Sequence, residues 1–514
     1  MIDATPLLRL YARWRGRQLA RQDAAAVQQR TLQRLVRQAA ATRFGRDHHF
    51  AAIRDIGDFQ AAVPLRRYED LWTAYWQAGF PVLRDDTWPG RVRYFAATSG
   101  TSTGATKFIP VTREMLQSNR QGALDLVVHH LLRRPRSRMF AGKSLLLGGS
   151  TDLARLAPGI ASGDLSGIAA ATVPLWARPF MYPPSDIARL ADWSDKTARL
   201  AAAAPAAGIR SISGTPSWLL LFFDELVRRD ANGRDRLVDF FPDLELVVHG
   251  GVNFAPYRPR FAEWLAGSHA ELREVYAASE GFIAAADRGD DDGLRVVADH
   301  GIFYEFVPVA EIDAAAPARH WLTDVETGVD YALAVSTCAG LWAYLIGDIV
   351  RFVGRDPPRL VVTGRLSYTL SAFGEHLTGE EVEAAAAAAA AAIGGELRDF
   401  AAGALYPEKS GDLGGHLYIV EFERPVAAAA LARFADAIDR DLCRRNLDYA
   451  AHRAGGFGMA APRISALPPG GFAEWMRRRG RLGGQNKVPR IISDPSLFTD
   501  LRAFAAARAT DGDP

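Results

Sequence analysis

The residues best suited to chemistry lie in a loop rich in hydroxyl groups and glycine. It reads Thr98-Ser99-Gly100-Thr101-Ser102-Thr103-Gly104-Ala105-Thr106-Lys107 and is followed by Phe108-Ile109-Pro110-Val111. Glycine lets a backbone come close to a phosphate. Hydroxyl and N–H groups can hydrogen-bond phosphate oxygens, and a lysine neutralises their charge. The spacing of a Walker A loop is absent, and a plain Ser/Thr/Gly linker explains the loop equally well.

The lysine that ends this loop favours phosphate binding over a linker. The chain has very few lysines, namely Lys107, Lys143, Lys196, Lys409 and Lys487. Arginine is the basic residue almost everywhere else. A lysine at this position therefore indicates a need for a compact point charge.

Two further segments end predicted strands with residues that suit a nucleotide. The first is Tyr276-Ala277-Ala278-Ser279-Glu280-Gly281, where Glu280 could hold Mg²⁺ on ATP. The second contains the glycine pair Gly250-Gly251, whose bend could admit a flat adenine ring. Taken alone, Glu280 is better explained as a surface residue of a turn. His249 receives no role.

Three segments nearer the C-terminus add charged candidates. Asp348 follows Tyr344-Leu345-Ile346-Gly347, and its carboxylate could accept both ribose hydroxyls, although an aspartate in a tight turn is an equally good reading. Gly364-Arg365 comes next. Lys487 follows Gly483-Gly484-Gln485-Asn486, a glycine-containing loop that could deliver a charge or could simply be a basic surface loop.

Strand-like and helix-like segments alternate through the first half of the chain, which predicts parallel sheets covered by helices. Residues 6–40 are expected to be helical. The other predicted helices are Arg113–Arg133, Ser217–Arg229 and Pro256–Ala266, and the predicted strands are Val92–Ala96, Ser144–Leu147, Ile209–Ser213, Leu244–His249 and Glu271–Tyr276.

The pattern changes to strand after strand between Ile302 and Val362, which predicts an antiparallel sheet or a distorted barrel. Two of these predicted strands are Trp342–Leu345 and Ile349–Val353. Beyond Gly364-Arg365 a compact α+β unit is expected, with its first helix at Thr378–Ile393. We therefore predict an α/β protein with a large domain, residues 1–366, and a small mobile α+β domain, residues 367–514.

The overall composition excludes several classes of protein. The chain has 514 residues and a formal net charge of +2, which disfavours a nucleic-acid-coating role. No apolar run is long enough to span a membrane. The two cysteines form neither a disulfide framework nor a zinc motif, so a reducing, cytoplasmic location is expected. The oligomeric state cannot be predicted.

Five of these segments, taken in their order, resemble the adenylate-forming superfamily of acyl-CoA synthetases, adenylation domains and luciferases. They are the Thr98–Lys107 loop, Tyr276–Gly281, Tyr344–Asp348, the segment that begins at Gly364-Arg365, and the loop that contains Lys487. More closely, the chain is similar to the auxin-responsive acyl-acid amido synthetases and their bacterial relatives. Many acyl-CoA synthetases have Pro-Lys-Gly where this chain has Thr106-Lys107-Phe108, and Tyr-Gly-x-Thr-Glu where it has Tyr276–Glu280. Both departures favour the amido synthetases. Ser367 replaces the usual hinge residue.

The resemblance implies an adenylate-forming fold, the substrates of the reaction and a role for each candidate residue. ATP with Mg²⁺ would adenylate a carboxylic acid, and an amine, expected to be an amino acid, would take the acyl group. The loop from Thr98 through Ser99, Gly100, Thr101, Ser102 and Thr103 to Lys107 would hold the phosphates. Gly250, Gly251 and the segment Tyr276, Ala277, Ala278 and Ser279 would flank adenine. Glu280 would bind Mg²⁺, Asp348 and Arg365 the ribose, and Lys487 would reach the reacting carboxylate.

Two other functions remain open on this sequence. The first is an acyl-CoA ligase, which would form the same adenylate and use coenzyme A as the acceptor. The second is a non-catalytic protein that binds an acyl group or a nucleotide on the same scaffold. The presence of Lys107, Glu280, Asp348 and Lys487 together disfavours the second alternative.

Overall fold

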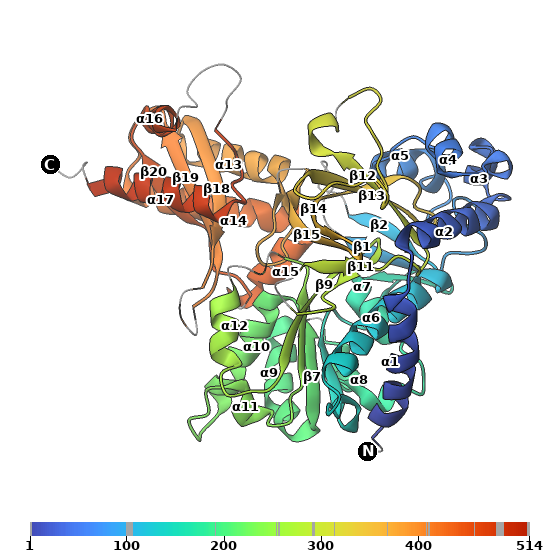
Figure 1. The fold of residues 1–514 in the computed structure, drawn as a ribbon. Coiled ribbons are helices and arrows are strands. Elements are labelled where there is room, and N and C mark those ends of the chain that lie inside the picture. Colours follow the sequence, from blue (N-terminus) through green and yellow to red (C-terminus); the bar gives the residue numbers. More distant parts are fainter. Residues whose placement is uncertain are drawn as a thin grey trace. The chain divides into compact units, whose positions relative to one another are not determined.

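A computed structural model describes residues 3–98, 106–190, 192–252, 254, 257–289, 293–312, 314–366, 369–407, 409, 412–456, 458–479 and 488–510 (Figure 1). The chain divides into two compact units. The first unit contains the described residues up to Leu366 except Thr106 and Tyr257. The second contains these two residues and the described residues from Thr369 onward. None of the described helices combines the length and the apolar character of a membrane span.

The N-terminal segment, predicted to be helical over residues 6–40, forms two helices. Helix α1 covers Thr5–Ala20 and α2 covers Ala24–Ala39. The break lies at Arg21–Asp23, where the carboxylate of Asp23 accepts a hydrogen bond of 3.0 Å from the backbone N–H of Ala26. An aspartate in this position caps a new helix. Short helices α3 (Arg43–Asp47), α4 (Ile56–Ala62) and α5 (Tyr68–Leu71) follow.

One sheet of eleven strands forms the centre of the first unit. Its parallel part has the order β6-β3-β7-β8-β9. These strands cover Met181–Tyr182, Lys143–Leu147, Ile209–Gly214, Leu246–Gly250 and Glu271–Ala278. The helices that alternate with these strands along the chain are α6 (Arg113–Arg133), α8 (Ser185–Ala188), α9 (Trp193–Ala203), α10 (Pro216–Arg229), α11 (Leu237–Phe240) and α12 (Arg258–Trp264), whereas α7 (Leu165–Ala171) contacts the smaller sheet described below. Figure 1 shows α1 and α6 on one side of the parallel strands and α9, α10 and α12 on the other.

The antiparallel strands continue the same sheet and do not form a separate barrel. From β9 the order runs β10-β11-β15-β14-β13-β12. These strands cover Gly281–Ala285, Leu294–Val296, Pro358–Arg365, Tyr344–Arg355, Asp330–Thr337 and Ile302–Pro308. The predicted strands Trp342–Leu345 and Ile349–Val353 are parts of one strand, β14, because a bulge and not a turn lies between them.

A smaller sheet carries the predicted phosphate loop. It has the order β2-β1-β5-β4, with β1 at Tyr94–Thr98, β2 at Lys107–Val111, β4 at Ala154–Ala157 and β5 at Ile160–Gly163. Helix α6 begins directly after β2, where the hydroxyl of Thr112 accepts a hydrogen bond of 3.1 Å from the N–H of Met115. The helix has the predicted bounds, Arg113–Arg133.

The second unit has a three-stranded sheet, β18 (Leu397–Leu405), β19 (Gly415–Phe422) and β20 (Arg463–Leu467). Its helices are α13 (Gly379–Ile393), α14 (Ala428–Arg445), α15 (Leu447–Arg453), α16 (Gly471–Arg478) and α17 (Pro495–Thr510). Strands β16 (Thr369–Leu370) and β17 (Leu377–Thr378) form a hairpin. Thr378 and Glu381 cap α13 reciprocally, which explains why the alanine-rich segment starts as a helix at this point.

A buried ion-pair network joins α1 to α6. Arg15 donates hydrogen bonds of 2.8 and 2.7 Å to the carboxylate of Asp125 and of 2.8 and 2.9 Å to that of Asp299. His300 lies 2.8 Å from Asp125. Burial alone would raise the pKa of Asp125, but the hydrogen bonds from Arg15 and His300 lower it to about 2.

We expect Arg15→Met to destabilise the first unit by about 3–5 kcal/mol, because it leaves the buried Asp125 carboxylate without its partner. Arg13→Met, on the exposed face of the same helix, is the matched control and should change stability by about 0.5 kcal/mol or less. Urea unfolding measures both. The ionised Asp125 stabilises the fold above its unfolded pKa of about 4, and this contribution is lost as pH falls towards 2. Equal stability of the two variants at pH 7 would contradict the network's role.

Candidate active site

The two described flanks of the predicted phosphate loop are cross-strand partners. Thr98, the last residue of β1, pairs with Lys107, the first residue of β2. Of the loop, Ser99, Gly100, Thr101, Ser102, Thr103, Gly104 and Ala105 lie outside the described residues. Lys107 therefore stands where the loop rejoins the sheet.

Lys107 is held in a half-buried position among charged groups. Its ammonium nitrogen lies 5.4 Å from the centre of the Tyr68 ring. Burial lowers the pKa of Lys107, while the nearby carboxylates of Glu69 and Glu280 raise it. An anionic ligand would favour the charged form of a lysine in this situation.

Tyr68 and Glu69 reach this place because the segment before α5 pairs with β14. The N–H of Arg66 donates to the carbonyl oxygen of Ala343 over 3.0 Å, and the N–H of Leu345 donates to that of Arg66 over 2.8 Å. The Tyr68 hydroxyl then accepts a hydrogen bond of 2.9 Å from the N–H of Phe108, next to Lys107. Burial raises the pKa of Tyr68 to about 12, so its hydroxyl stays protonated.

Glu280 occupies the tight turn between β9 and β10. Ala278 pairs with Gly281, so that Ser279 and Glu280 are the two turn residues. Gly281 has φ +149°. A Cβ atom there would lie 2.5 Å from Cδ1 of Ile302, so a larger residue would push the turn away from the sheet. The turn thus holds the Glu280 side chain in a buried position, with 8% of its surface exposed.

The Glu280 carboxylate lies within the electrostatic reach of three other candidates. Burial raises its pKa, the negative charge of Asp348 raises it further, and Lys107 and Arg365 lower it. Burial raises the pKa of the Tyr344 hydroxyl, and the negative charge of the nearby Glu280 carboxylate raises it further. Residues far apart in sequence, Lys107, Glu280, Asp348 and Arg365, are therefore brought into one charged site.

A bulge in β14 positions Asp348. In the β13–β14 ladder, Ala332 pairs with Ile349 and Ala334 pairs with Leu345, so β14 has more residues than β13 between these two pairs. Gly347 is one of the residues in this bulge and has φ +96°. Asp348 pairs with Arg365 across the β14–β15 ladder. Its carboxylate lies 3.0 Å from Nε of Arg365 and accepts a hydrogen bond of 2.6 Å from the hydroxyl of Tyr276. Each oxygen keeps a lone pair for a further donor.

The glycine pair proposed to flank adenine lies next to β9. Gly250 ends β8 and pairs with Val275. A Cβ atom on Gly250 would lie 2.2 Å from the carbonyl oxygen of Val275, so close strand packing alone already requires this glycine. Gly251 has φ +88° and turns the chain away from the strand. Within β9, Tyr276 is buried, whereas Ala277 is exposed and Ala278 half-buried.

Three tyrosines lie beside the charged residues. Tyr276 donates a hydrogen bond to Asp348, Lys107 lies over the Tyr68 ring, and the charge of Glu280 acts on Tyr344. Tyr276 was predicted at the site only as a residue that flanks adenine, and the motifs assigned no role to Tyr68 or Tyr344. Tyr344 opens the segment that ends in Asp348, but nothing in the spacing showed that its hydroxyl faces Glu280. Tyr68 lies on a short helix that carries no motif. Lys487 lies outside the described residues, and its role stays a prediction.

The fold and the family of the chain follow from comparison with known proteins. The chain has the fold of GH3.15 acyl acid amido synthetase, with a TM-score of 0.58 and 19% identity over 94% of each chain. It also has the fold of 2-hydroxyisobutyryl-CoA ligase in complex with 2-HIB-AMP and CoA, with a TM-score of 0.59 and 18% identity over 95% of this chain and 94% of the other.

Sequence models of one family match three successive parts of the chain. The GH3 family N-terminal domain matches residues 17–203, the central domain residues 295–365 and the C-terminal domain residues 380–496. The chain belongs to the GH3 family.

Curated relatives match over shorter stretches. Indole-3-acetic acid-amido synthetase GH3.8 of Oryza sativa subsp. indica is 27% identical over 49% of this chain and 44% of its own length. Jasmonoyl–L-amino acid synthetase JAR4 of Nicotiana attenuata is 23% identical over 41% of this chain and 38% of its own length. The chain spans about half the length, or less, of the curated relatives it matches.

We expect Gly347→Ala to destabilise the protein by about 1–3 kcal/mol, because alanine is strained at this positive φ. Gly354→Ala is the matched control in the same strand, since no positive φ is found there and a Cβ atom would meet its nearest neighbour only at 3.9 Å. Thermal unfolding compares the two. Similar midpoints would show that the bulge does not require a left-handed residue.

Proposed function

We propose that this protein is an ATP-dependent acyl acid amido synthetase. It adenylates a carboxylic acid with release of pyrophosphate and then transfers the acyl group to the amino group of an amino acid. The observation that carries the proposal is the convergence of Lys107, Glu280, Asp348 and Arg365 on one site in a GH3-family chain. The names of the curated relatives, amido synthetases for indole-3-acetic acid and jasmonate, support this reaction class.

The chemistry explains why ATP is needed. A carboxylate does not acylate an amine at neutral pH, because oxide would be its leaving group. In the first step, a carboxylate oxygen attacks the α-phosphorus of ATP, the bond to the bridging oxygen breaks, and pyrophosphate leaves. In the second step, the amine attacks the acyl carbon, AMP leaves, and the amine loses a proton. The first step brings anions together, so positioning and charge neutralisation are what the protein must supply.

The described residues suit the first step. Lys107 would neutralise the phosphates, and Asp348 with Arg365 would hold the ribose. Glu280 fits a magnesium ion, because its carboxylate is buried and its pKa is raised by that burial, so that a divalent cation would stabilise the ionised form. Mg²⁺ in nucleotide sites typically takes one or two carboxylates together with phosphates. When bound, the ion would reduce the negative charge of ATP as pyrophosphate leaves.

The proposal extends to the domain organisation and to the location of the protein. Residues 1–366 would carry the ATP and acyl sites, and residues 367–514 would form a small domain that supplies Lys487 to the adenylation step. A cytoplasmic location is supported by two free cysteines, Cys338 and Cys443.

The direct test is release of pyrophosphate from ATP and Mg²⁺ with a panel of carboxylic acids. We expect aromatic or aliphatic acids, including auxin- and jasmonate-like ones, to release pyrophosphate and not phosphate. Mass spectrometry of reactions with amino acids or with coenzyme A then identifies the acceptor. An amide product supports the proposal, and a thioester would replace it by a CoA ligase. Formation of only ADP and phosphate with every acid would exclude adenylation.

We expect Glu280→Gln to lower the rate of pyrophosphate release by roughly two to three orders of magnitude, by analogy with the loss of one preorganised electrostatic group. Glu326→Gln, on an exposed loop, is the control and should keep the wild-type rate. A wild-type rate in Glu280→Gln at equal Mg²⁺ would refute the metal-binding role.

We expect Lys487→Ala to slow the release of pyrophosphate, because a charge that faces the reacting phosphate is lost. The conversion of a supplied acyl-adenylate to the amide, measured separately, should stay largely intact. Equal loss in both half-reactions would contradict a role confined to adenylation.

A further inference from the structure

A cavity in the first unit lies at the junction of α1, α2 and α6. Its volume is about 380 Å³. Trp14 of α1, Arg34 of α2 and Glu114 of α6 stand at its mouth, and Ser118, Gly301 and Cys338 lie deeper. Four glutamine side chains, those of Gln18, Gln38, Gln117 and Gln121, complete a mainly polar wall.

This cavity lies on a different face of α6 from the candidate active site. Glu114, Gln117, Ser118 and Gln121 line the cavity, with the spacing of three and four residues that defines one helix face. The turn that carries Glu280 contacts α6 through other residues. The N–H of Phe282 donates to Asn119 over 3.0 Å, and a Cβ atom on Gly281 would lie 3.4 Å from the sulfur of Met115.

Two opposite charges face the cavity without neutralising each other. Arg34 and Glu114 form no ion pair with each other or with any other side chain that the structure describes. Both act on the thiol of Cys338 at the inner end of the cavity. Burial raises the pKa of Cys338 to about 12, Glu114 raises it and Arg34 lowers it. A terminal nitrogen of Arg34 also lies 3.7 Å from the position that a Cβ atom on Gly301 would take.

The inner wall contains a polar group that the protein leaves unsatisfied. Ser118 is 2% exposed, and its hydroxyl has no hydrogen-bond partner among the described groups. Buried hydroxyls are normally hydrogen-bonded, so a buried hydroxyl without a partner needs an explanation.

The acidic cluster at one side of the cavity does not indicate a metal ion as the ligand of this cavity. Asp125, Asp299 and His300 are close enough to hold a metal ion, but Arg15 already neutralises both carboxylates.

We propose that this cavity is a binding site for a small zwitterion, namely a free α-amino acid. Its carboxylate would pair with Arg34 and its ammonium group with Glu114, while the glutamine amides and the Ser118 hydroxyl supply further hydrogen bonds and the Trp14 ring an apolar surface. A simple anion would leave Glu114 unpaired, and a simple cation would leave Arg34 unpaired. The inference rests on these residues alone and is independent of the proposed synthetase activity.

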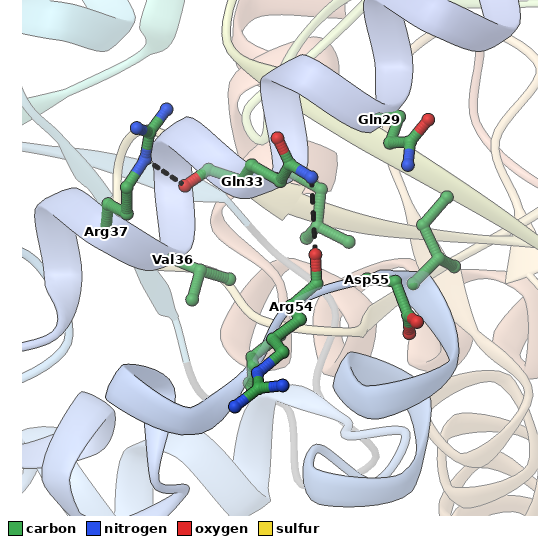
Figure 2. A pocket seen from close by; sticks show the side chains of 9 residues that line it. Gln29, Gln33, Val36, Arg37, Arg54 and Asp55 are labelled. Carbon is green, nitrogen blue, oxygen red and sulfur yellow. Dashed lines mark hydrogen bonds between the residues drawn. The ribbon is translucent and has the colours of Figure 1, made fainter.

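Another cavity of the first unit lacks these features and provides the control. It has a volume of about 170 Å³ and lies between α2 and the start of α4 (Figure 2). In Figure 2, Arg37 bonds the backbone oxygen of Gln33, and the Gln33 amide bonds the backbone oxygen of Arg54. The residues that line it include no buried polar atom without a partner. Arg37 lies on the same helix as Arg34, one turn further along, and is likewise exposed to solvent.

The test is calorimetric titration of the full chain, without ATP, with each of the twenty common L-amino acids. We expect at least one to bind at millimolar concentration or below. For the amino acid that binds best, the analogues that lack the amino group or the carboxyl group should bind at least tenfold more weakly. Arg34→Gln and Glu114→Gln should each weaken binding about tenfold or more, and Arg37→Gln should not.

The double exchange Arg34→Glu with Glu114→Arg separates a zwitterion from a simple ion. Because both charges remain present, the amino acid can bind in the reversed orientation, and the double variant should bind more tightly than either Arg34→Glu or Glu114→Arg alone. Thermal unfolding confirms that each variant is folded. The proposal is overturned if no amino acid binds, if Arg34→Gln and Glu114→Gln bind as well as the Arg37→Gln control, or if the double exchange gives no recovery.

Discussion

The candidate site depends on a strong curl of the large sheet, and the hydrogen bond between Tyr276 and Asp348 shows this curl. Tyr276 lies in β9 and Asp348 in β14, and the sheet order between them is β9-β10-β11-β15-β14. Four strand spacings in a flat sheet amount to roughly 19 Å. A contact of 2.6 Å is therefore possible only if this part of the sheet curls strongly. The curl brings the Glu280 turn, the bulge at Gly347 and Arg365 to one place.

Short elements allow the curl. Strand β11 has only three residues, and its pairings with β10 and β15 each involve two residue pairs. Register shifts interrupt the β9–β10, β13–β14 and β14–β15 ladders. Bulges increase local twist and redirect side chains. The same irregularities that bend the sheet therefore also place Asp348 against Tyr276 and Arg365.

Local sequence patterns predicted the individual helices and strands better than the order in which the strands pair into sheets. Helix α6 has the predicted bounds, and its start is set locally, because the hydroxyl of Thr112 caps it. The change to successive strands after Ile302 predicts an antiparallel sheet or a distorted barrel. The strands do form antiparallel ladders, but the pattern does not show that they extend the parallel sheet. The pairing of β15 with β11 joins residues far apart in sequence, which no local pattern shows. For the same reason, Tyr68 and Tyr344 could not be assigned to the site, since their positions depend on the contact of Arg66 with β14.

The electrostatics of the site follow from burying charges of both signs close together. Burial raises the pKa of Glu280 and lowers that of Lys107, so the charged form of each is disfavoured, and each partly relieves the other. The tyrosine hydroxyls around them stay protonated, because burial raises their pKa values as well. Under the proposed function, ATP with its magnesium ion would bring a cation to Glu280 and an anion to Lys107 at the same time. Binding would then stabilise the charged forms of both groups, and a site that is unfavourable without its ligand becomes complementary to it.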